Sequence, residues 1–127
     1  MTIDPLGTSS ADIYNTPEHE LFRATVRKFV QEELVPRARE FDQMGRIDKR
    51  LFKKMGDLGM LGLRYDPKWG GAGLDWSFTA VMFEEIARCD NAGVSMGISV
   101  HTDMATPSLH QFGSDDLCRR YLVPAIK

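Results

Sequence analysis

The sequence predicts an all-α fold, an up-and-down helical bundle of about five helices. Apolar residues recur at three- and four-residue steps along most of the chain, which is the period of an amphipathic helix. Prolines and glycines divide this pattern into segments of helical length, with Pro17, Pro36, Gly45, Gly59 and Gly113 at the divisions. No segment shows the convincing apolar–polar alternation of a half-buried strand.

Composition limits the class of protein. A chain of 127 residues with 43% hydrophobic and 27% charged residues is expected to form one globular domain. The net charge of −2 gives no electrostatic footprint for nucleic acid or for an anionic membrane, and no apolar run approaches membrane-spanning length. Cys89 and Cys118 match neither a metal spacing nor a disulfide framework, so we interpret them as reduced core thiols. Because no arginine precedes Arg23 and no signal-peptide core is present, we expect a cytoplasmic protein.

The first helix follows a polar stretch, residues 1–15, which we interpret as a flexible lead-in. Thr16 is the expected N-cap and Pro17 the first helical residue. Pro36 should kink or interrupt the helix, and Glu33 and Arg37 have the spacing of an i,i+4 ion pair. The apolar stripe of this helix comprises Phe22, Val26, Phe29, Val30, Leu34, Ala38 and Phe41.

A short second helix is expected between Asp48, as N-cap, and Gly59. Its inward residues are predicted to be Leu51, Phe52, Met55 and Leu58. The following loop contains Gly70, Gly71 and Gly73, which allow close backbone approach. We do not interpret it as a phosphate-binding loop, because its glycine spacing differs from the known motifs and no strand precedes it.

The third helix, residues 76–90 with Asp75 as N-cap, is predicted to be the most buried. Only a narrow arc through Ser77, Glu84 and Arg88 is polar, and Glu84 and Arg88 have the spacing of an ion pair. Its expected apolar surroundings comprise Trp76, Phe78, Ala80, Met82, Phe83, Ile86 and Ala87.

The fourth helix, residues 92–112, contains no Lys, Arg or Glu. Its predicted core stripe comprises Val94, Ile98, Ala105, Leu109 and Phe112. The opposite side carries Ser95, Ser99, Thr102, Asp103 and Thr106, flanked by Met96. Such a face either meets something outside this chain or lines a cavity, or its hydroxyls are buried and bond to their own helix. Both interpretations stay open.

A fifth helix should begin at Ser114 and continue toward Lys127, where no terminal capping signal is present; we therefore expect a longer natural protein. The three histidines do not have metal-ligand spacing, so we expect no metal site. Ser99, His101 and Asp103 are two residues apart and point in different directions on a helix, which excludes a triad. We expect no catalytic residue in this chain.

Several motifs resemble the N-terminal helical domain of the acyl-CoA dehydrogenases. They are LGMLGLR at 58–64, WGGAGLD at 69–75 and EEIAR at 84–88, and the resemblance extends from about Thr16 to the last residue. It implies a domain at 16–127 of an FAD-dependent enzyme that dehydrogenates acyl-CoA thioesters at the α,β-bond. In the family, the FAD sites and the catalytic glutamate lie on a later β-domain and a C-terminal helical bundle. This chain alone is therefore expected to bind no FAD and to be inactive.

The resemblance implies two roles for this domain. Ser95, Met96, Ser99 and Asp103 match positions that line the acyl pocket, although Asp103 departs from an apolar lining. A second set matches a docking groove for the electron-transferring flavoprotein between the first, third and fourth helices and the glycine loop: Phe22, Phe29, Leu74 and Met82. Homo-oligomers are expected of the full-length protein. The alternatives are a related flavin-dependent monooxygenase and a stand-alone helical interaction module.

Overall fold

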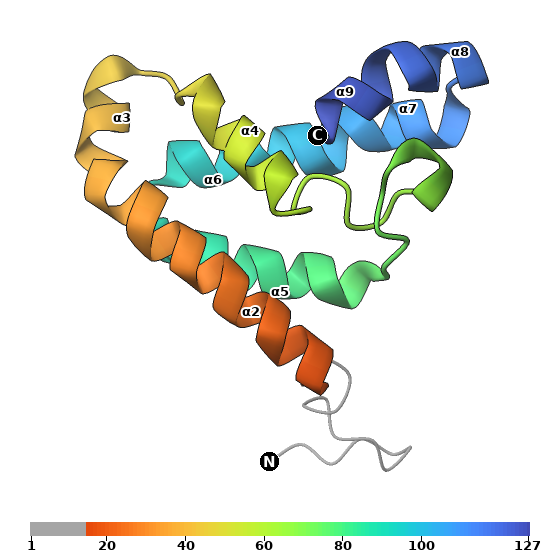
Figure 1. The fold of residues 1–127 in the computed structure, drawn as a ribbon. Coiled ribbons are helices and arrows are strands. Elements are labelled where there is room, and N and C mark those ends of the chain that lie inside the picture. Colours follow the sequence, from red (N-terminus) through yellow and green to blue (C-terminus); the bar gives the residue numbers. More distant parts are fainter. Residues whose placement is uncertain (1–14) are drawn as a thin grey trace, which may run out of the picture.

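The computed structural model describes residues 15–127, which are all-α and contain no strand, as the sequence predicts. Five main helical segments follow one another along the chain, and a short 3₁₀ turn, η3 (Pro67–Trp69), lies in the loop between the second and the third (Figure 1). The segments are α2 (Pro17–Phe29), η1 (Val30–Leu34), η2 (Val35–Arg37) and α3 (Ala38–Met44); α4 (Lys49–Asp57); α5 (Trp76–Ile86) and η4 (Ala87–Cys89); α6 (Ala92–Ser99), η5 (Val100–Ala105) and α7 (Thr106–Phe112); and α8 (Asp115–Leu117), η6 (Cys118–Leu122) and α9 (Val123–Ala125). Apart from residue 15, the predicted lead-in lies outside the described residues.

The helix starts agree with the predicted N-caps. Thr16, Asp48, Asp75 and Ser114 each accept a backbone N–H from the first turn of the helix that follows. An additional cap, Asn91, starts α6: its side-chain oxygen accepts from the Val94 N–H at 2.9 Å, and its amide donates to the Ala38 carbonyl at 2.9 Å. Side chains that satisfy the unpaired N–H groups of a first turn fix where each helix begins.

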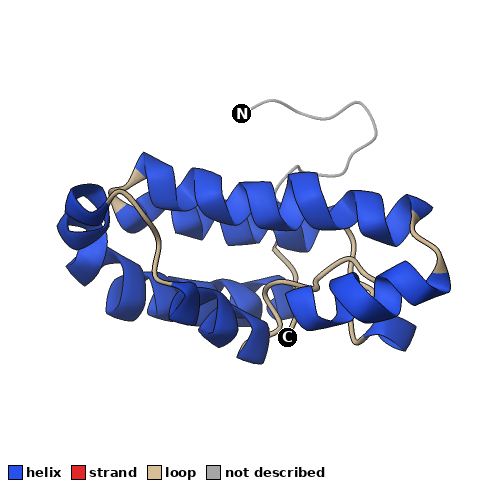
Figure 2. Ribbon diagram, turned by 90° about the horizontal axis from the view of Figure 1, so that it is seen from above, coloured by secondary structure: helices blue, strands red, loops and turns tan. Residues whose placement is uncertain are grey.

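The core lies between two layers of helices (Figure 2). Helix α5 packs along α2, and six of its eleven residues are buried, more than in any other helix of residues 15–127. Some side chains of the second and third helices that were predicted to face the core are exposed, among them Trp76, Leu58 and Ala87. Trp76 is 65% exposed because it starts α5 at the edge of the core, and Leu58 is 45% exposed because it follows the last turn of α4. Cys89 and Cys118 are buried free thiols, as expected.

Three prolines explain the irregular parts of the long helices. Pro36, Pro107 and Pro124 each lie two residues after the end of a π-helical turn, which are η1, η5 and η6. A proline inside a helix has no N–H to donate, and its ring collides with the carbonyl four residues earlier. Widening the preceding turn to the i→i+5 pattern removes this collision without ending the helix. The interruption predicted at Pro36 is thus confirmed.

The π-turn η5 changes which residues of the fourth helix are buried. A uniform helix would bury Ala105 and Phe112, but Ala105 is exposed and Phe112 is 80% exposed. The buried residues continue from Val94 and Ile98 to Thr102 and Thr106, at steps of four. Because η5 is wound more slowly than an α-helix, four-residue steps stay on one face. The predicted core stripe was therefore wrong at Ala105 and Phe112, whereas Leu109 is partly buried and packs on the core as predicted.

Both predicted intrahelical ion pairs were also wrong. Arg37 pairs with Glu40 and Asp48, while Glu33 pairs with Lys54, because a proline-induced irregularity separates residues 33 and 37. On α5, Glu84 pairs with Arg23 at 2.6 Å, and Arg88 reaches Glu85 instead. Because α2 packs against α5, Arg23 of α2 pairs with Glu84, and Arg88, one turn after Glu84, pairs with Glu85.

Candidate functional site

The glycine loop holds the centre of the candidate site in place. Backbone bonds join its two sides: the Ala72 N–H donates to Gly62, the Gly73 N–H to Tyr65 and the Leu74 N–H to Leu63. Gly71 lies so close to Tyr65 that a β-carbon would be 2.1 Å from its carbonyl oxygen. The glycines thus serve close backbone approach, as predicted, and fix the direction of residues 63–65.

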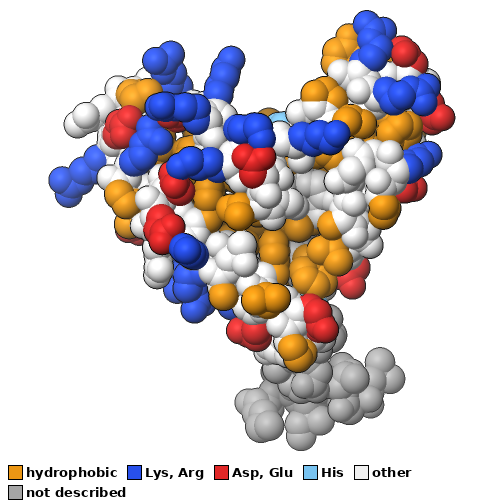
Figure 3. Space-filling view, viewed as in Figure 1, with side chains coloured by type: hydrophobic (Ala, Val, Ile, Leu, Met, Phe, Trp, Pro, Cys, Tyr) orange, Lys and Arg blue, Asp and Glu red, His pale blue; other side chains and the backbone are white. Residues whose placement is uncertain are grey.

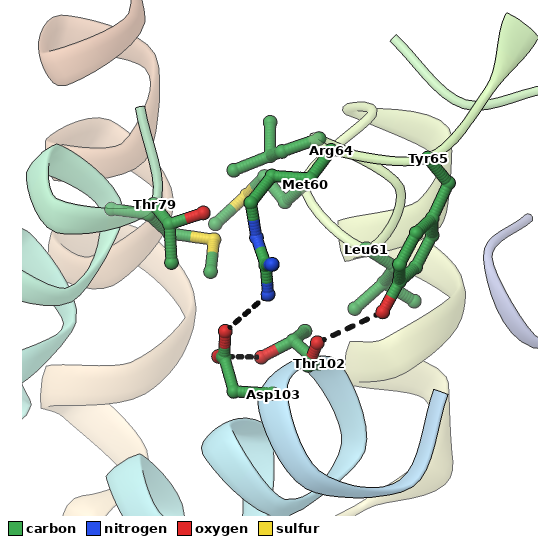
Figure 4. A pocket seen from close by; sticks show the side chains of 9 residues that line it. Met60, Leu61, Arg64, Tyr65, Thr79, Thr102 and Asp103 are labelled. Atoms are coloured by element: carbon green, nitrogen blue, oxygen red, sulfur yellow. Dashed lines mark hydrogen bonds and ion pairs between the residues drawn. The ribbon is translucent and has the colours of Figure 1, made fainter. Parts of the chain in front are cut away.

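Arg64 and Asp103 form a half-buried ion pair between this loop and the fourth helix (Figure 4). Arg64 Nη2 donates to Asp103 Oδ1 at 2.8 Å, and the other carboxylate oxygen accepts from the Thr102 hydroxyl at 2.7 Å. The two side chains are 16% and 19% exposed. The guanidinium also lies 3.4 Å from the centre of the Trp76 ring, a cation–π contact. The charge of the Asp103 carboxylate is thus neutralised by Arg64.

Tyr65 anchors the same loop on the other side of the ion pair. Its hydroxyl donates to the Thr102 carbonyl at 3.0 Å and contacts the Thr106 hydroxyl at 2.6 Å. Burial raises the pKa of Tyr65 above its usual range, and the Thr106 hydrogen bond partly opposes this. The neutral phenol is therefore kept as a structural anchor of the π-turn.

The four residues assigned to the acyl pocket lie along one side of the fourth helix. Met96 is 57% exposed, and Ser95, Ser99 and Asp103 are partly exposed. Ser95 bonds within the domain, to Cys89 Sγ at 3.4 Å. Each of the two interpretations of this face therefore holds for part of it. Thr102 and Thr106 are buried and bond to their own helix, whereas Ser99 and Asp103 are partly exposed. Exposed Met96, Val100 and Met104 lie at four-residue steps along this side.

The four residues assigned to docking do not form one open surface. Phe29 and Met82 are buried, and Phe22 and Leu74 are half-buried and pack on the core. Phe29 alone among them lines a groove of about 480 Å³, which lies between α2, η1 and α4. The full lining of this groove comprises Thr25, Lys28, Phe29, Glu32, Glu33, Lys54, Asp57 and Leu58.

Basic side chains gather over α3 and α4, and apolar side chains are exposed between α4 and α5 (Figure 3). Several of the bases are paired with acids: Lys54 contacts Glu33 at 2.6 Å, Lys53 contacts Asp57, and Arg37 contacts Asp48 at 3.1 Å. These pairs reduce the local positive charge, so the groove presents charges of both signs around an apolar floor.

A chain of hydrogen bonds connects the first turns of α2 and α5. The Ser77 hydroxyl donates to Asp75, His19 Nε2 contacts the Ser77 oxygen at 2.6 Å, and His19 Nδ1 contacts the Thr16 hydroxyl at 2.8 Å. The serine lies between the histidine and the carboxylate, whereas a catalytic triad has the histidine in the middle. The Ser77 hydrogen bond also lowers the pKa of Asp75. We assign this chain to helix capping.

Chemistry elsewhere in the described part of the chain is sparse. Within residues 15–127, no three His, Cys, Asp or Glu side chains are grouped so that they could hold a metal ion. His101 Nε2 donates to the Ala125 carbonyl at 2.8 Å, and His110 Nε2 accepts from the Asp66 N–H at 3.3 Å, so each of these two histidines makes a separate structural hydrogen bond. No helix in this region is both long enough and apolar enough to cross a membrane.

Comparison with known proteins identifies the family. Residues 16–127 match the family model for the acyl-CoA dehydrogenase N-terminal domain. The chain is 34% identical over 105 residues to the mitochondrial long-chain specific acyl-CoA dehydrogenase of Sus scrofa, covering 83% of this chain and 24% of that protein. It is 35% identical over 117 residues to the short-chain specific acyl-CoA dehydrogenase of Clostridium acetobutylicum, covering 91% and 30%.

Solved structures agree with these matches. An acyl-CoA dehydrogenase from Geobacillus kaustophilus superposes with a TM-score of 0.82 at 30% identity, covering 89% of this chain and 29% of that one. Butyryl-CoA dehydrogenase from Megasphaera elsdenii gives 0.77 at 28% identity, covering 88% and 30%. The chain thus spans less than a third of these relatives. By its motifs, its fold and the match over residues 16–127, the chain belongs to the acyl-CoA dehydrogenase family and corresponds to the N-terminal helical domain.

Proposed function

We propose that this domain serves a full-length, FAD-dependent enzyme that dehydrogenates acyl-CoA thioesters. The observation that carries the proposal is the match of residues 16–127 to the family's N-terminal domain. The related proteins named above are acyl-CoA dehydrogenases with long-chain, short-chain and butyryl specificities. FAD would accept the hydride when bound to the parts of the protein beyond this domain. The domain itself supplies no base, and its role is to shape the substrate site and the docking surface.

The fourth helix supports the assignment of a pocket wall. Ser99 and Asp103 stay accessible although their neighbours Ile98 and Thr102 are buried, so the helix offers a second side to a ligand. Met96 extends that side with an apolar surface. A wall of small hydroxyls and apolar side chains suits an acyl chain, because most of its contacts are apolar and its few polar groups fix orientation.

Flavin reduction in the full-length protein tests this function. The purified protein should contain FAD, and its flavin absorbance should bleach anaerobically when a saturated acyl-CoA is added. The 127-residue chain alone, purified in the same way, should contain no flavin and show no turnover. A full-length protein whose flavin is not reduced by any acyl-CoA, but which consumes oxygen to hydroxylate a substrate, would identify the monooxygenase instead.

We also propose that electron-transferring flavoprotein docks beside Phe22 and Leu74. Both are half-buried and pack against the core cluster, which includes the buried residues Phe29 and Met82. A Leu74→Ala change should raise the KM for the electron-transferring flavoprotein several-fold, because an apolar anchor is lost. Anaerobic bleaching by acyl-CoA should stay unchanged. Phe112→Ala, at a residue that is 80% exposed on α7, is the matched control. Equal effects of both changes would refute this docking site.

A further inference from the structure

The Arg64 guanidinium has donors that the domain does not use. Arginine carries five N–H groups, and the one hydrogen bond found for this guanidinium among residues 15–127 joins Nη2 to Asp103. Trp76 covers one face of the group but accepts no in-plane hydrogen bond. The Asp103 carboxylate, by contrast, already accepts from Arg64 and Thr102. Each Asp103 oxygen thus already has one donor, whereas most of the Arg64 donors have no protein acceptor among residues 15–127, so the guanidinium can bind an added hydrogen-bond acceptor.

A small cavity lies next to this pair. It measures about 10 Å³, and Figure 4 shows Arg64 and Asp103 meeting beside Thr79 and Met60. A volume of this size holds roughly one water-sized group. The lining residues are Met60, Leu61, Leu63, Arg64, Tyr65, Thr79, Met82, Thr102 and Asp103.

Thr79 is a second polar group directed at this cavity. Its side chain is on α5, the residue is only 7% exposed, and its hydroxyl oxygen points toward the side of Arg64 (Figure 4). Among residues 15–127 no hydrogen-bond partner is found for that hydroxyl. No buried side-chain nitrogen or oxygen among residues 15–127 lacks a hydrogen-bond partner, so the Thr79 hydroxyl is not sealed inside the core and can be reached by a group in the cavity. Arg64 and Thr79 thus offer donors from two sides to a single small group.

The size and charge of the site define the group that fits. One oxygen atom fits the volume, whereas a carboxylate would bring a second negative charge beside Asp103. Since Asp103 already neutralises Arg64, a neutral hydroxyl or keto oxygen is favoured over an anion. The apolar side chains Met96, Val100 and Met104 continue along the helix from Asp103, so the rest of the ligand would be apolar.

On the proposed function of the fourth helix as a pocket wall, we infer that Arg64, with Thr79 and Asp103, determines specificity for acyl groups that carry a neutral oxygen on the chain. The oxygen accepts from the Arg64 guanidinium and occupies the cavity. Unsubstituted chains leave the guanidinium and the Thr79 hydroxyl without an acceptor, and a site built for a hydrogen bond discriminates against a ligand that lacks the group.

The test compares two substrate series with the full-length protein. One series consists of saturated acyl-CoA thioesters from butyryl-CoA to palmitoyl-CoA, and the other of their ω-hydroxy counterparts. Varying the length moves the hydroxyl along the pocket wall. We expect kcat/KM to favour the hydroxylated substrate by about tenfold or more at one length, since a hydrogen bond to a charged donor is worth a change of that order.

Two variants assign the preference to the site. In Arg64→Met with Asp103→Leu, apolar groups of similar length replace the whole pair, so no buried charge is left alone. The preference for ω-hydroxy substrates should then disappear. Thr79→Val keeps the shape and removes one hydroxyl, and it should reduce the preference several-fold. The matched control is Arg120→Met with Asp116→Leu, an exposed ion pair on the last helical segment, which should leave the preference unchanged.

Three results would overturn the inference. The first is an equal or lower kcat/KM for the hydroxylated substrate at every chain length. The others are a hydroxyl preference that survives in the Arg64–Asp103 double variant, or a hydroxyl preference that the Arg120–Asp116 control variant removes to the same extent. The unsubstituted series separates the two levels of proposal. If those substrates are oxidised but no hydroxyl preference exists, only the specificity fails. If neither series is oxidised, the proposed function fails as well.

Discussion

Glu85 is a buried carboxylate on which the packing of α2 against α5 depends. Its side chain is 0% exposed and accepts from Arg27 at 2.9 and 2.8 Å and from Arg23 at 3.1 Å, with Arg88 at 3.4 Å. The change Glu85→Gln keeps the shape but removes the charge. The glutamine amide would also direct its own N–H₂ donor at the guanidinium groups, which have no acceptor for it.

The expected loss is about 3 kcal/mol in the free energy of unfolding, the lower end of the range for breaking a buried ion pair. The lower end applies because Arg27 and Arg88 are 47% and 65% exposed and can be hydrated once the carboxylate is gone. Glu84→Gln is the matched control on the same helix. Glu84 is 56% exposed and contacts Arg23 alone, so its loss should cost at most about 1 kcal/mol.

Urea unfolding followed by far-UV circular dichroism measures both changes in the same chain. A loss of about 3 kcal/mol corresponds to a fall of roughly 10 °C in the thermal midpoint. The pH dependence has a definite sign. The Arg27 hydrogen bonds hold the pKa of Glu85 below its ordinary value of 4.5, with Arg23 assisting and burial opposing. The stabilisation is therefore complete above about pH 4.5 and is lost as the pH falls through the lowered pKa.

The difference between wild type and Glu85→Gln should accordingly narrow below pH 4.5, since protonation then neutralises the wild-type side chain as well. Equal destabilisation by Glu84→Gln and Glu85→Gln at neutral pH, or a loss of less than 1 kcal/mol for Glu85→Gln, would show that burial does not strengthen this ion pair.

Two further changes test the glycine loop and the pocket wall. Gly71→Ala should abolish cooperative folding or lower the free energy of unfolding by several kcal/mol, because its β-carbon would lie 2.1 Å from the Tyr65 carbonyl oxygen. Gly93→Ala is the milder comparison, since its β-carbon would be 3.3 Å from the Asn91 side chain. Similar unfolding midpoints for the two variants would contradict the argument. In the full-length protein, Ser99→Phe should move the substrate with the highest kcat/KM to a shorter acyl-CoA, because a larger side chain would shorten the proposed pocket. An unchanged chain-length preference would count against the fourth helix as a pocket wall.

The all-α class, the helix starts and the family could all be recognised from short stretches of sequence. Helix periodicity and N-caps are local properties, so Thr16, Asp48, Asp75 and Ser114 could be recognised from neighbouring residues alone. The family motifs are local as well, because they depend on glycines and side chains within short stretches. Pro107 is a local signal of the same kind: it follows the π-turn η5, which brings Thr102 and Thr106 to the buried side of the helix.

The pairing of charged side chains depends on how the helices and the glycine loop pack against one another. Glu84 and Glu85 are neighbours with the same chemistry, yet one is exposed and the other is enclosed by arginines of a helix about 60 residues earlier. Arg64 and Asp103 are separated by 39 residues, and no periodicity connects them. Long side chains reach several partners, and the partner that is chosen depends on how two helices or a loop and a helix approach each other. Sequence spacing contains no information on that approach, and for this reason the polar site beside Thr79 became visible only in three dimensions.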